Sequence, residues 1–324
     1  MQVLPAVALA AALAAAFYFA RWLTLFMVGL FLDHPIVTLA PDEPEEPAEP
    51  GEAGEPEPDF DFPSRDGVRL RGRFILSRRR TQRIAIFFHE FGADATAWRR
   101  YLWFLPEAGW HVFTFDFRGS GNSLAPDGHR AHKWVTAGEV ADAAAALDVV
   151  GARALAEGWE VAGFGASRGG AAMLMAAVAC PWLRTMACEG VSSTLESVYW
   201  HMRRWARIYV PAWLLACIPG PGWRVLSHLV VLAAETRERL RFPDLAEQLR
   251  ALHDRRILFA YGTKDSLINE GHRQAVMAAF PGAREAWLMP RVGHLAGPSQ
   301  CRDEYRWRML SWLESGTFPR RDGR

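Results

Sequence analysis

Cysteine is scarce in this sequence: its 324 residues include four, and no two of them have the C-x-x-C spacing. Zinc sites built on cysteine use such close pairs, so no metal site is predicted and no cofactor is expected. A chain of this size does not need disulfides, so we interpret Cys180, Cys188, Cys217 and Cys301 as small buried apolar residues. A hydrophobic share of 50% excludes a disordered chain.

Positive charge is nearly missing from the first 61 residues, which hold one basic residue, Arg21, and eleven acidic ones. The rest of the chain holds 36 of the 37 basic residues and 25 of the 36 acidic ones. The formal net charge of +1 therefore sums a leading segment of about −10 and a body of about +11. A body of this charge is attracted to anionic lipid headgroups, and we expect no nucleic-acid partner.

The chain begins with an apolar run from Val3 to Leu32. Thirty helical residues span about 45 Å, more than the hydrocarbon core of about 30 Å, so we expect residues 1–33 to be an uncleaved, single-pass membrane anchor. A cleaved signal peptide is the alternative, because the Ala-rich stretch at Ala14–Ala16 resembles a cleavage site. Against it, no Lys or Arg precedes the run, which continues past this stretch. A buried helix of a soluble protein is the third interpretation.

The segment after this run is acidic and rich in proline. Residues 41–61 contain six prolines, ten acidic residues and no basic ones. The acidic side chains repel one another, and the segment has little apolar surface to bury. We therefore predict an extended linker over residues 34–61. No Lys or Arg lies between Leu23 and Ser64, so the amino terminus and Arg21 set the orientation. They favour the N-terminus inside and the body on the periplasmic or extracellular side.

From residue 62 the sequence alternates between strand and helix patterns. Strands are predicted over 68–76, 83–88, 111–115, 159–164, 183–188, 257–261 and 286–289. Helices are predicted over 98–105, 140–155 and 169–179, and after each of the last two strands. This order predicts an α/β domain over 62–316, a mostly parallel sheet with helices on both faces, followed by a tail at 317–324. The strand at 68–76 alternates apolar and basic residues, which is typical of an antiparallel edge strand.

The alternation of strand and helix patterns stops between residues 194 and 252, where no strand is predicted. The segment is rich in tryptophan and is interrupted at Pro211 and at 219–221. We interpret it as a helical insertion over the carboxyl ends of the strands, where open α/β sheets bind ligands. An extra packing layer and a substrate-shaping cap are equally good interpretations.

One short motif carries the strongest chemical signal. Gly165, Ser167 and Gly169 form a G-x-S-x-G pattern between an apolar strand and a helix of small residues. Small residues allow the strained turn of a nucleophile elbow, which lifts a serine hydroxyl above the sheet. The alternative is an ordinary strand–helix turn with a capping serine.

A serine nucleophile needs a base and an orienting acid, and two later loops supply candidates. Asp265 follows the strand at 257–261, and His294 follows the strand ending at Met289. Both loops lie at carboxyl ends of predicted strands, in the order serine, acid, histidine. A lone loop residue of either kind is usually solvated, but this arrangement predicts that the three side chains meet.

Backbone N–H groups for a developing oxyanion are expected after the strand at 83–88, in His89-Glu90-Phe91-Gly92. The predicted donors are the N–H of Phe91, or of Glu90, and that of Arg168. The segment 116–123, after the next strand, is interpreted as a structural turn in which Asp116 and Arg118 fix loops near the site.

Taken together, these motifs resemble those of the α/β-hydrolase superfamily over residues 60–316. They are HEFG at 89–92, DFRGSGNS at 116–123, GASRG at 165–169, GTKDSLI at 262–268 and GH at 293–294. The arrangement is most similar to membrane-associated esterases, lipases and acylglycerol lipases with a helical cap. The resemblance implies Ser167 as nucleophile, His294 as general base and acid, and Asp265 as orienter.

One position departs from the family pattern. Many relatives have glycine directly after the first histidine, where this chain has Glu90. The departure puts the oxyanion donor and the charge of the pocket in question. Glu189, at the end of the strand before the insertion, is a second candidate for the role of Asp265.

The function expected from these residues is hydrolysis of a carboxylic ester through an acyl-enzyme, with a small-molecule or lipid-like acyl substrate such as an acylglycerol. A peptidase or an acyltransferase would use the same triad. A non-catalytic binding protein with this fold is a further alternative, because a fold does not fix a function. The intact set of serine, acid and histidine argues against it.

Overall fold

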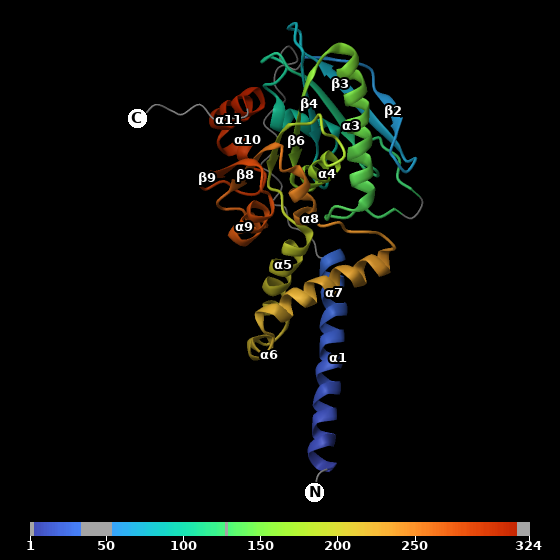
Figure 1. The fold of residues 1–324 in the computed structure, drawn as a ribbon, viewed down its shortest axis with the longest axis vertical. Helices are drawn as coiled ribbons and strands as arrows, with labels where there is room; N and C mark the ends of the chain where they lie inside the picture. The colour runs from blue at the N-terminus through green and yellow to red at the C-terminus, as the bar shows by residue number, and fades with distance from the viewer. Residues whose placement is uncertain (1–2, 34–53, 127–128, 316–324) are drawn as a thin grey trace. The chain divides into compact units, whose positions relative to one another are not determined.

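The computed structural model describes residues 3–33, 54–126 and 129–315 (Figure 1). The chain divides into two compact units. The larger comprises Thr38–Thr194 and Pro243–Arg324, and the smaller comprises Met1–Val37 and Leu195–Phe242. Most of the predicted linker, up to residue 53, and the predicted tail at 317–324 lie outside the described residues.

The larger unit is built on one twisted sheet with the strand order β1-β3-β5-β4-β6-β7-β8-β9, and β2 also pairs with β3. From β5 to β9 all neighbours are parallel, whereas β3 is antiparallel to β5, β1 and β2. The predicted mostly parallel α/β class is confirmed. The strands are β1 (Glu55–Pro56), β2 (Phe60–Pro63), β3 (Arg69–Leu76), β4 (Arg83–Phe88), β5 (His111–Asp116), β6 (Glu160–Ala166), β7 (Thr185–Glu189), β8 (Arg256–Gly262) and β9 (Ala283–Met289).

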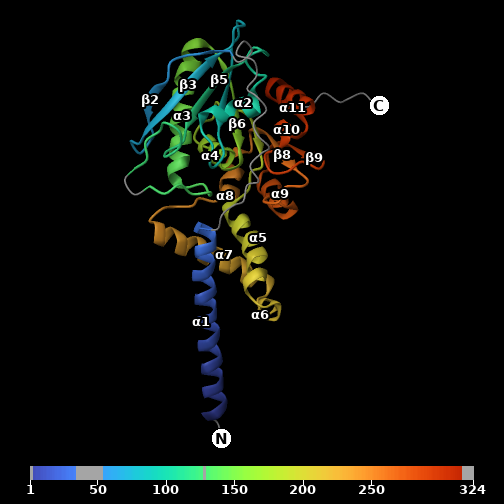
Figure 2. The ribbon, with the colours of Figure 1, turned by 180° about the vertical axis from the view of Figure 1, so that it is seen from behind.

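Helices cover both faces of this sheet (Figure 2). On β4, Ile84 and Ile86 point into one core cluster with residues of α3, α4, α8 and α9, and Ala85 and Phe87 into the other with residues of α2 and α11. Side chains of a strand alternate between faces, so a strand buried on both faces needs the continuous apolar run seen here. The helices are α2 (Trp98–Leu102), α3 (Ala137–Glu157), α4 (Ser167–Ala177), α8 (Leu245–Leu249), α9 (Glu270–Ala279), α10 (Gly297–Gln300) and α11 (Arg302–Ser315).

The structure corrects two predictions at the start of this unit. The linker ends before residue 55, because β1 and β2 continue the sheet, and β3 is therefore not an edge strand. Phe60 stacks on Phe74 with ring centroids 5.7 Å apart. The acidic side chains of this stretch pair with the arginines of the body, for example Asp61 with Arg71 at 2.8 Å. Attraction between the two charge blocks and burial of phenylalanine thus bring the end of the acidic segment onto the sheet.

The smaller unit contains α1 (Val3–Asp33), α5 (Thr194–Tyr209), α6 (Ala212–Ala216) and α7 (Gly220–Glu238). The carboxyl-terminal half of α1 packs against α7, which buries Leu23, Met27 and Phe31. By length and composition α1 could cross a membrane, although a signal sequence and a soluble core helix meet the same criteria. The predicted insertion at 194–252 is too long, because Leu245 and Leu249 of α8 are buried in the core of the larger unit.

All four cysteines are free, as expected, but the prediction that they are buried holds only for Cys180 and Cys188. Cys301 is half-buried and Cys217 is exposed, because it follows the short helix α6 at the surface of the smaller unit.

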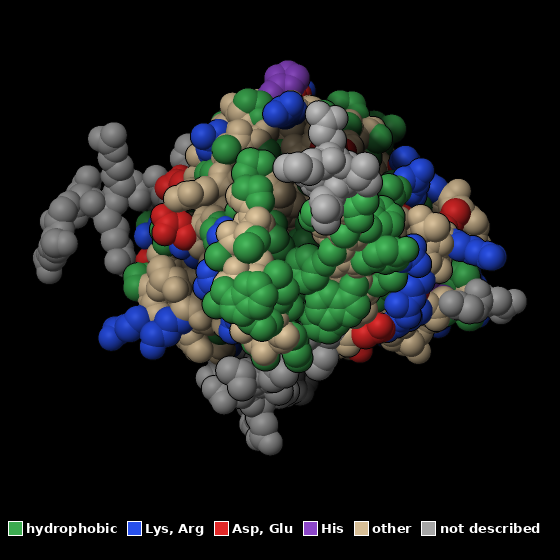
Figure 3. Space-filling view, turned by 90° about the horizontal axis from the view of Figure 1, so that it is seen from below, with side chains coloured by type: hydrophobic (Ala, Val, Ile, Leu, Met, Phe, Trp, Pro, Cys, Tyr) green, Lys and Arg blue, Asp and Glu red, His purple; other side chains and the backbone are tan. Residues whose placement is uncertain are grey.

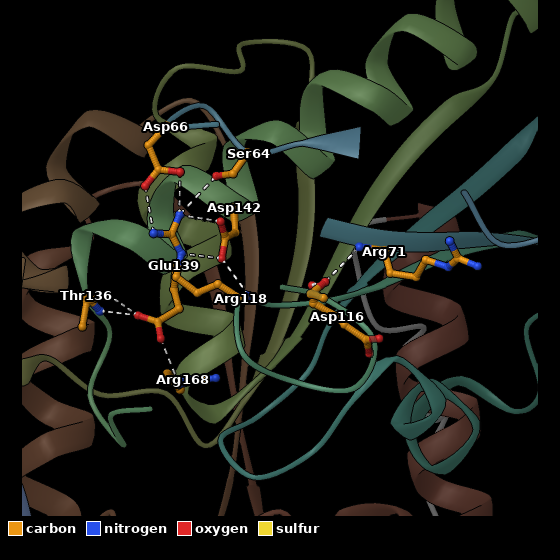
Figure 4. Close-up of polar contacts among 10 residues, drawn as sticks. Ser64, Asp66, Arg71, Asp116, Arg118, Thr136, Glu139, Asp142 and Arg168 are labelled. Carbon is orange, nitrogen blue, oxygen red and sulfur yellow. Dashed lines mark hydrogen bonds and ion pairs between the residues drawn. The ribbon is translucent and has the colours of Figure 1, made fainter. Parts of the chain in front are cut away.

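A buried cluster of charges holds the turn after β5 (Figure 4). The Arg118 guanidinium donates to both carboxylate oxygens of Asp142, at 2.9 and 2.7 Å, and to those of Asp66, at 2.8 and 2.9 Å. Asp142 is fully buried on α3. Asp116 accepts the N–H groups of Ala95 and Asn122 at 2.6 and 2.8 Å. The predicted loop-fixing placement of Asp116 and Arg118 is thus what the structure shows.

We predict that Arg118→Met lowers the free energy of unfolding by about 3 kcal/mol, because it leaves the Asp142 carboxylate buried without its partner. Adding Asp142→Leu should restore part of the loss, since no uncompensated charge then remains. Thermal unfolding of both variants in detergent measures the effect. A double variant less stable than Arg118→Met alone would contradict this account.

Candidate active site

Ser167 occupies a strained turn between β6 and α4. Its φ is 46°, in the left-handed region that side-chain-bearing residues rarely adopt. A Cβ on Gly165 would lie 2.3 Å from Cα of Gly170, and one on Gly169 would lie 2.2 Å from the carbonyl oxygen of His89. Glycine is therefore required at both flanking positions of the motif, and the turn is a nucleophile elbow in geometry.

Asp265 and His294 reach this serine from two neighbouring loops. His294 Nδ1 lies 2.6 Å from Asp265 Oδ2, and Nε2 lies 3.3 Å from Ser167 Oγ. The other carboxylate oxygen of Asp265 accepts the N–H groups of Leu267 and Ile268, both at 2.8 Å. A carboxylate held in this way fixes the proton of the imidazole on Nδ1, which leaves Nε2 free to accept a proton from the serine. The structure brings the three predicted side chains together.

Backbone geometry at three further positions keeps His294 in place. Gly190, just after β7, has a φ of 67°, and a Cβ there would lie 2.9 Å from His294 Cε1. A Cβ on Gly262 would lie 2.2 Å from the carbonyl oxygen of Val292. Leu295 adopts a φ of 56°. Gly190 was not predicted as part of the site, although a glycine at the carboxyl end of a strand was the signal in the sequence.

The predicted oxyanion donors are Arg168, which follows the serine in the chain, and Glu90 or Phe91 in the loop after β4. Arg168 is in the first turn of α4, where the N–H groups have no partner within the helix. Its side chain points away, because Nη1 donates to the carbonyl of His132 at 2.7 Å and to Glu139 Oε1 at 3.0 Å. Phe91 is 41% exposed, and its ring lies 5.3 Å from the Arg168 guanidinium. Arg168 can therefore contribute its backbone N–H but not its charge.

Glu139, which was not predicted as part of the site, lies at the start of α3. It closes a capping box at the start of α3, where its Oε2 accepts the N–H of Thr136 at 2.8 Å, and its Oε1 accepts the hydrogen bond from Arg168. Figure 4 shows the carboxylate between these two partners. The T-x-x-E spacing was the signal in the sequence. Glu139 thus connects the start of α3 to the second residue of α4.

The structure places the Glu90 carboxylate away from the loop surface. It accepts hydrogen bonds from Arg100 and from Tyr101 Oη, the latter at 3.1 Å, and it is largely buried. His89 holds the same loop from the other side: Phe117 N–H donates to its Nε2 at 3.1 Å, so Nδ1 donates to the Glu90 carbonyl at 2.8 Å. Burial and nearby Arg168 lower the pKa of His89 to about 3, so it stays neutral. Glu90 therefore acts on the loop through an ion pair.

Glu189, the second candidate for the orienting acid, has a different partner. Its Oε1 accepts the N–H of Gly297 at 3.0 Å, whereas His294 is hydrogen-bonded to Asp265. The side chain is buried, and burial raises its pKa to about 7. Glu189 thus lies behind the histidine loop as a carboxyl group that is protonated in mildly acidic solution.

Comparisons with known proteins agree with this architecture. A family model described as serine aminopeptidase, S33, matches residues 79–215. A search of curated proteins finds no match. An esterase of Pyrococcus furiosus has a similar structure, with a TM-score of 0.60 at 16% identity over 82% of this chain and 92% of the esterase.

Two further solved structures resemble the chain. A membrane phospholipase A described as a bacterial virulence factor aligns with a TM-score of 0.55 at 16% identity, over 97% of this chain and 98% of its own. Acetyl xylan esterase 1 of a Thermoanaerobacterium species aligns with a TM-score of 0.55 at 18% identity, over 79% and 82%. The resemblance stated from the motifs is confirmed: the chain has the α/β-hydrolase fold, and residues 79–215 match a family model of serine hydrolases of this fold.

Proposed function

We propose that this chain is a serine hydrolase that cleaves carboxylic esters through an acyl-enzyme. The observation that carries the proposal is the placement of His294 between Asp265 and Ser167 at the strained elbow. This is the arrangement by which a weak serine hydroxyl becomes a nucleophile. The esterases and the phospholipase among the similar structures support an ester as substrate.

The mechanism follows from the positions of the donors and acceptors. Ser167 Oγ attacks the ester carbonyl carbon as His294 Nε2 takes the hydroxyl proton. The carbonyl oxygen becomes negative and is stabilised by the backbone N–H groups of Phe91 and Arg168. His294 then gives the proton to the leaving alkoxide, which departs as an alcohol. Water, deprotonated by His294, attacks the acyl-enzyme, and the carboxylic acid is released as Ser167 regains its proton.

We propose further that the substrate carries an apolar acyl chain and that α1 anchors the enzyme in a membrane. The length and apolar composition of α1 support the anchor, and so does the similar membrane phospholipase A. The amino-terminal charges favour a larger unit on the periplasmic or extracellular side. Peptide hydrolysis is the second candidate, because the matching family model is described as a serine aminopeptidase.

We predict that Ser167→Ala lowers kcat/KM for p-nitrophenyl esters by at least about 10³-fold, because the nucleophile is lost. Ser311→Ala, on α11, is the matched control and should leave the rate unchanged. The wild-type enzyme should prefer p-nitrophenyl octanoate to the acetate. Unchanged hydrolysis by Ser167→Ala would refute the proposed nucleophile, whereas cleavage of aminoacyl anilides without ester cleavage would favour the peptidase.

A second prediction concerns the orienting acid. Asp265→Asn should lower kcat by roughly 10³- to 10⁴-fold, because an amide N–H in place of the carboxylate favours the wrong imidazole tautomer. Glu189→Gln keeps the acceptor for the Gly297 N–H and should change kcat by less than about tenfold. Steady-state kinetics of the two variants decides between the acids, and the reverse ranking would assign the role to Glu189.

The raised pKa of Glu189 predicts a pH dependence of stability. Its carboxyl group ionises near pH 4.5 in the unfolded chain and near pH 7 in the folded one, so folding favours the protonated form. The contribution of this group is therefore full below pH 4.5 and is lost as the pH rises to 7, by about 3 kcal/mol in all. Chemical unfolding between pH 4.5 and 7 should show a weaker decline for Glu189→Gln. An identical decline in both proteins would show that Glu189 is not the group responsible.

A further inference from the structure

Helices α6 and α7 of the smaller unit expose large apolar side chains. Trp213 on α6 is 72% exposed, and Val225, Leu229 and Leu232 on α7 are 60, 46 and 56% exposed. The three α7 residues are spaced four and three apart, so they form one stripe along the helix. An exposed stripe of this kind, in a unit that also exposes a tryptophan, is typical of an interaction surface.

The opposite side of α7 is apolar as well. Trp223, Val230 and Ala234 are buried there, and the helix packs against α1. One apolar face is enough to hold a helix on a soluble protein, and its other face is then polar. A helix that is apolar on both faces lies in an apolar surrounding on both sides, which points to a lipid contact for the exposed stripe.

Helix α1 belongs to the same unit, and as the proposed anchor it defines how the membrane is oriented relative to α7. One side of the carboxyl-terminal half of α1 is buried, at Leu23, Met27 and Phe31 for example. Leu13, Phe17 and Trp22 nearer its start are 62, 65 and 50% exposed. Figures 1 and 2 both show α7 running across α1 rather than along it. A helix that crosses a membrane-spanning helix lies in the plane of the membrane, the orientation of interfacial helices.

The charges of the insertion fit an anionic headgroup layer. Residues 195–242 contain seven arginines, three glutamates and no Lys or Asp. Arg204, Arg207 and Arg239 are exposed, and Tyr209, which closely follows the first two in the chain, is 54% exposed. Figure 3 shows a broad area of apolar side chains on this face. Arginine, tyrosine and tryptophan around an apolar area are the composition of a surface at the headgroup boundary.

We propose that Trp213 and the stripe of Val225, Leu229 and Leu232 insert into the headgroup–acyl boundary of the leaflet that α1 enters. The insertion is then a second membrane contact, and lipid rather than a second copy of the chain covers its apolar face. This inference rests on the membrane anchoring proposed above for α1. It is independent of the ester chemistry at Ser167.

The test uses the full-length protein in vesicles of phosphatidylcholine and phosphatidylglycerol, with an NBD fluorophore on one cysteine. Leu229→Cys reports the stripe, and Leu155→Cys, at a position 88% exposed on α3, is the matched control; both carry Cys217→Ser. We expect lipids with a doxyl group at acyl carbon 5 to quench the Leu229→Cys probe several-fold more than the Leu155→Cys probe. Equal, weak quenching of both probes would overturn the proposal.

Two further probes separate the remaining outcomes. Native Cys217 is exposed at the end of α6 and can carry NBD without a substitution; we expect this probe to be quenched like the one at position 229. Burial raises the pKa of the Cys301 thiol to about 11, so Cys301 reacts slowly with the label. Leu13→Cys reports α1 alone. Quenching at position 13 but not at 229 or 217 would leave the anchor standing and overturn the inference. Cross-linking between Leu229→Cys chains without lipid quenching would show that a second copy covers the face, and would also overturn it.

Hydrolysis of p-nitrophenyl butyrate by each labelled protein keeps this test apart from the proposed function. Quenching at position 229 in a protein without esterase activity would support the lipid contact while the ester chemistry fails. Full esterase activity in a protein whose probe at position 229 is not quenched would support the ester chemistry and overturn the lipid contact.

Discussion

The strained backbone of Ser167 is the constraint on which the rest of the site depends. A side-chain-bearing residue in the left-handed region costs about 1–3 kcal/mol of free energy, which contacts in the surrounding structure must offset. Here those contacts are close backbone packing: the chain at Gly165 touches Gly170, and Gly169 touches the carbonyl of His89. The same packing ties the elbow to the end of β4, from which the predicted oxyanion loop starts. The position of Ser167 and that of the predicted oxyanion loop therefore both depend on this contact between the elbow and the end of β4.

Buried polar networks surround this contact on several sides. Glu139 joins the start of α3 to Arg168, Glu90 pairs with Arg100, and Arg118 pairs with Asp142. Each ion pair gives a largely buried carboxylate an arginine partner. Buried pairs of this kind add little net stability, but losing one partner is costly, which makes them effective at fixing loops in one conformation.

Much of the fold was predictable because its signals are local. β4 is an unbroken apolar run, the elbow is a five-residue motif, and Asp265 and His294 each follow a strand in sequence, so topology alone brings their loops to one edge. The contacts missed depend on distant partners. Asp59 and Asp61 pair with arginines of β3, and α1 packs on α7 about 200 residues away. Composition showed that the acidic segment is charged and that α1 is apolar, but not which part of the protein each would pack against.

The central claim is that Ser167 is the reacting nucleophile. Trypsin releases it in the peptide Ala154–Arg168, in which Ser167 is the single hydroxyl-bearing residue, so an adduct can be assigned without fragmentation. Brief treatment of the folded protein with a fluorophosphonate, followed by mass spectrometry, should show this peptide heavier by one phosphonyl group and unmodified in heat-unfolded protein. An unmodified peptide from folded, hydrolytically active protein would contradict the account.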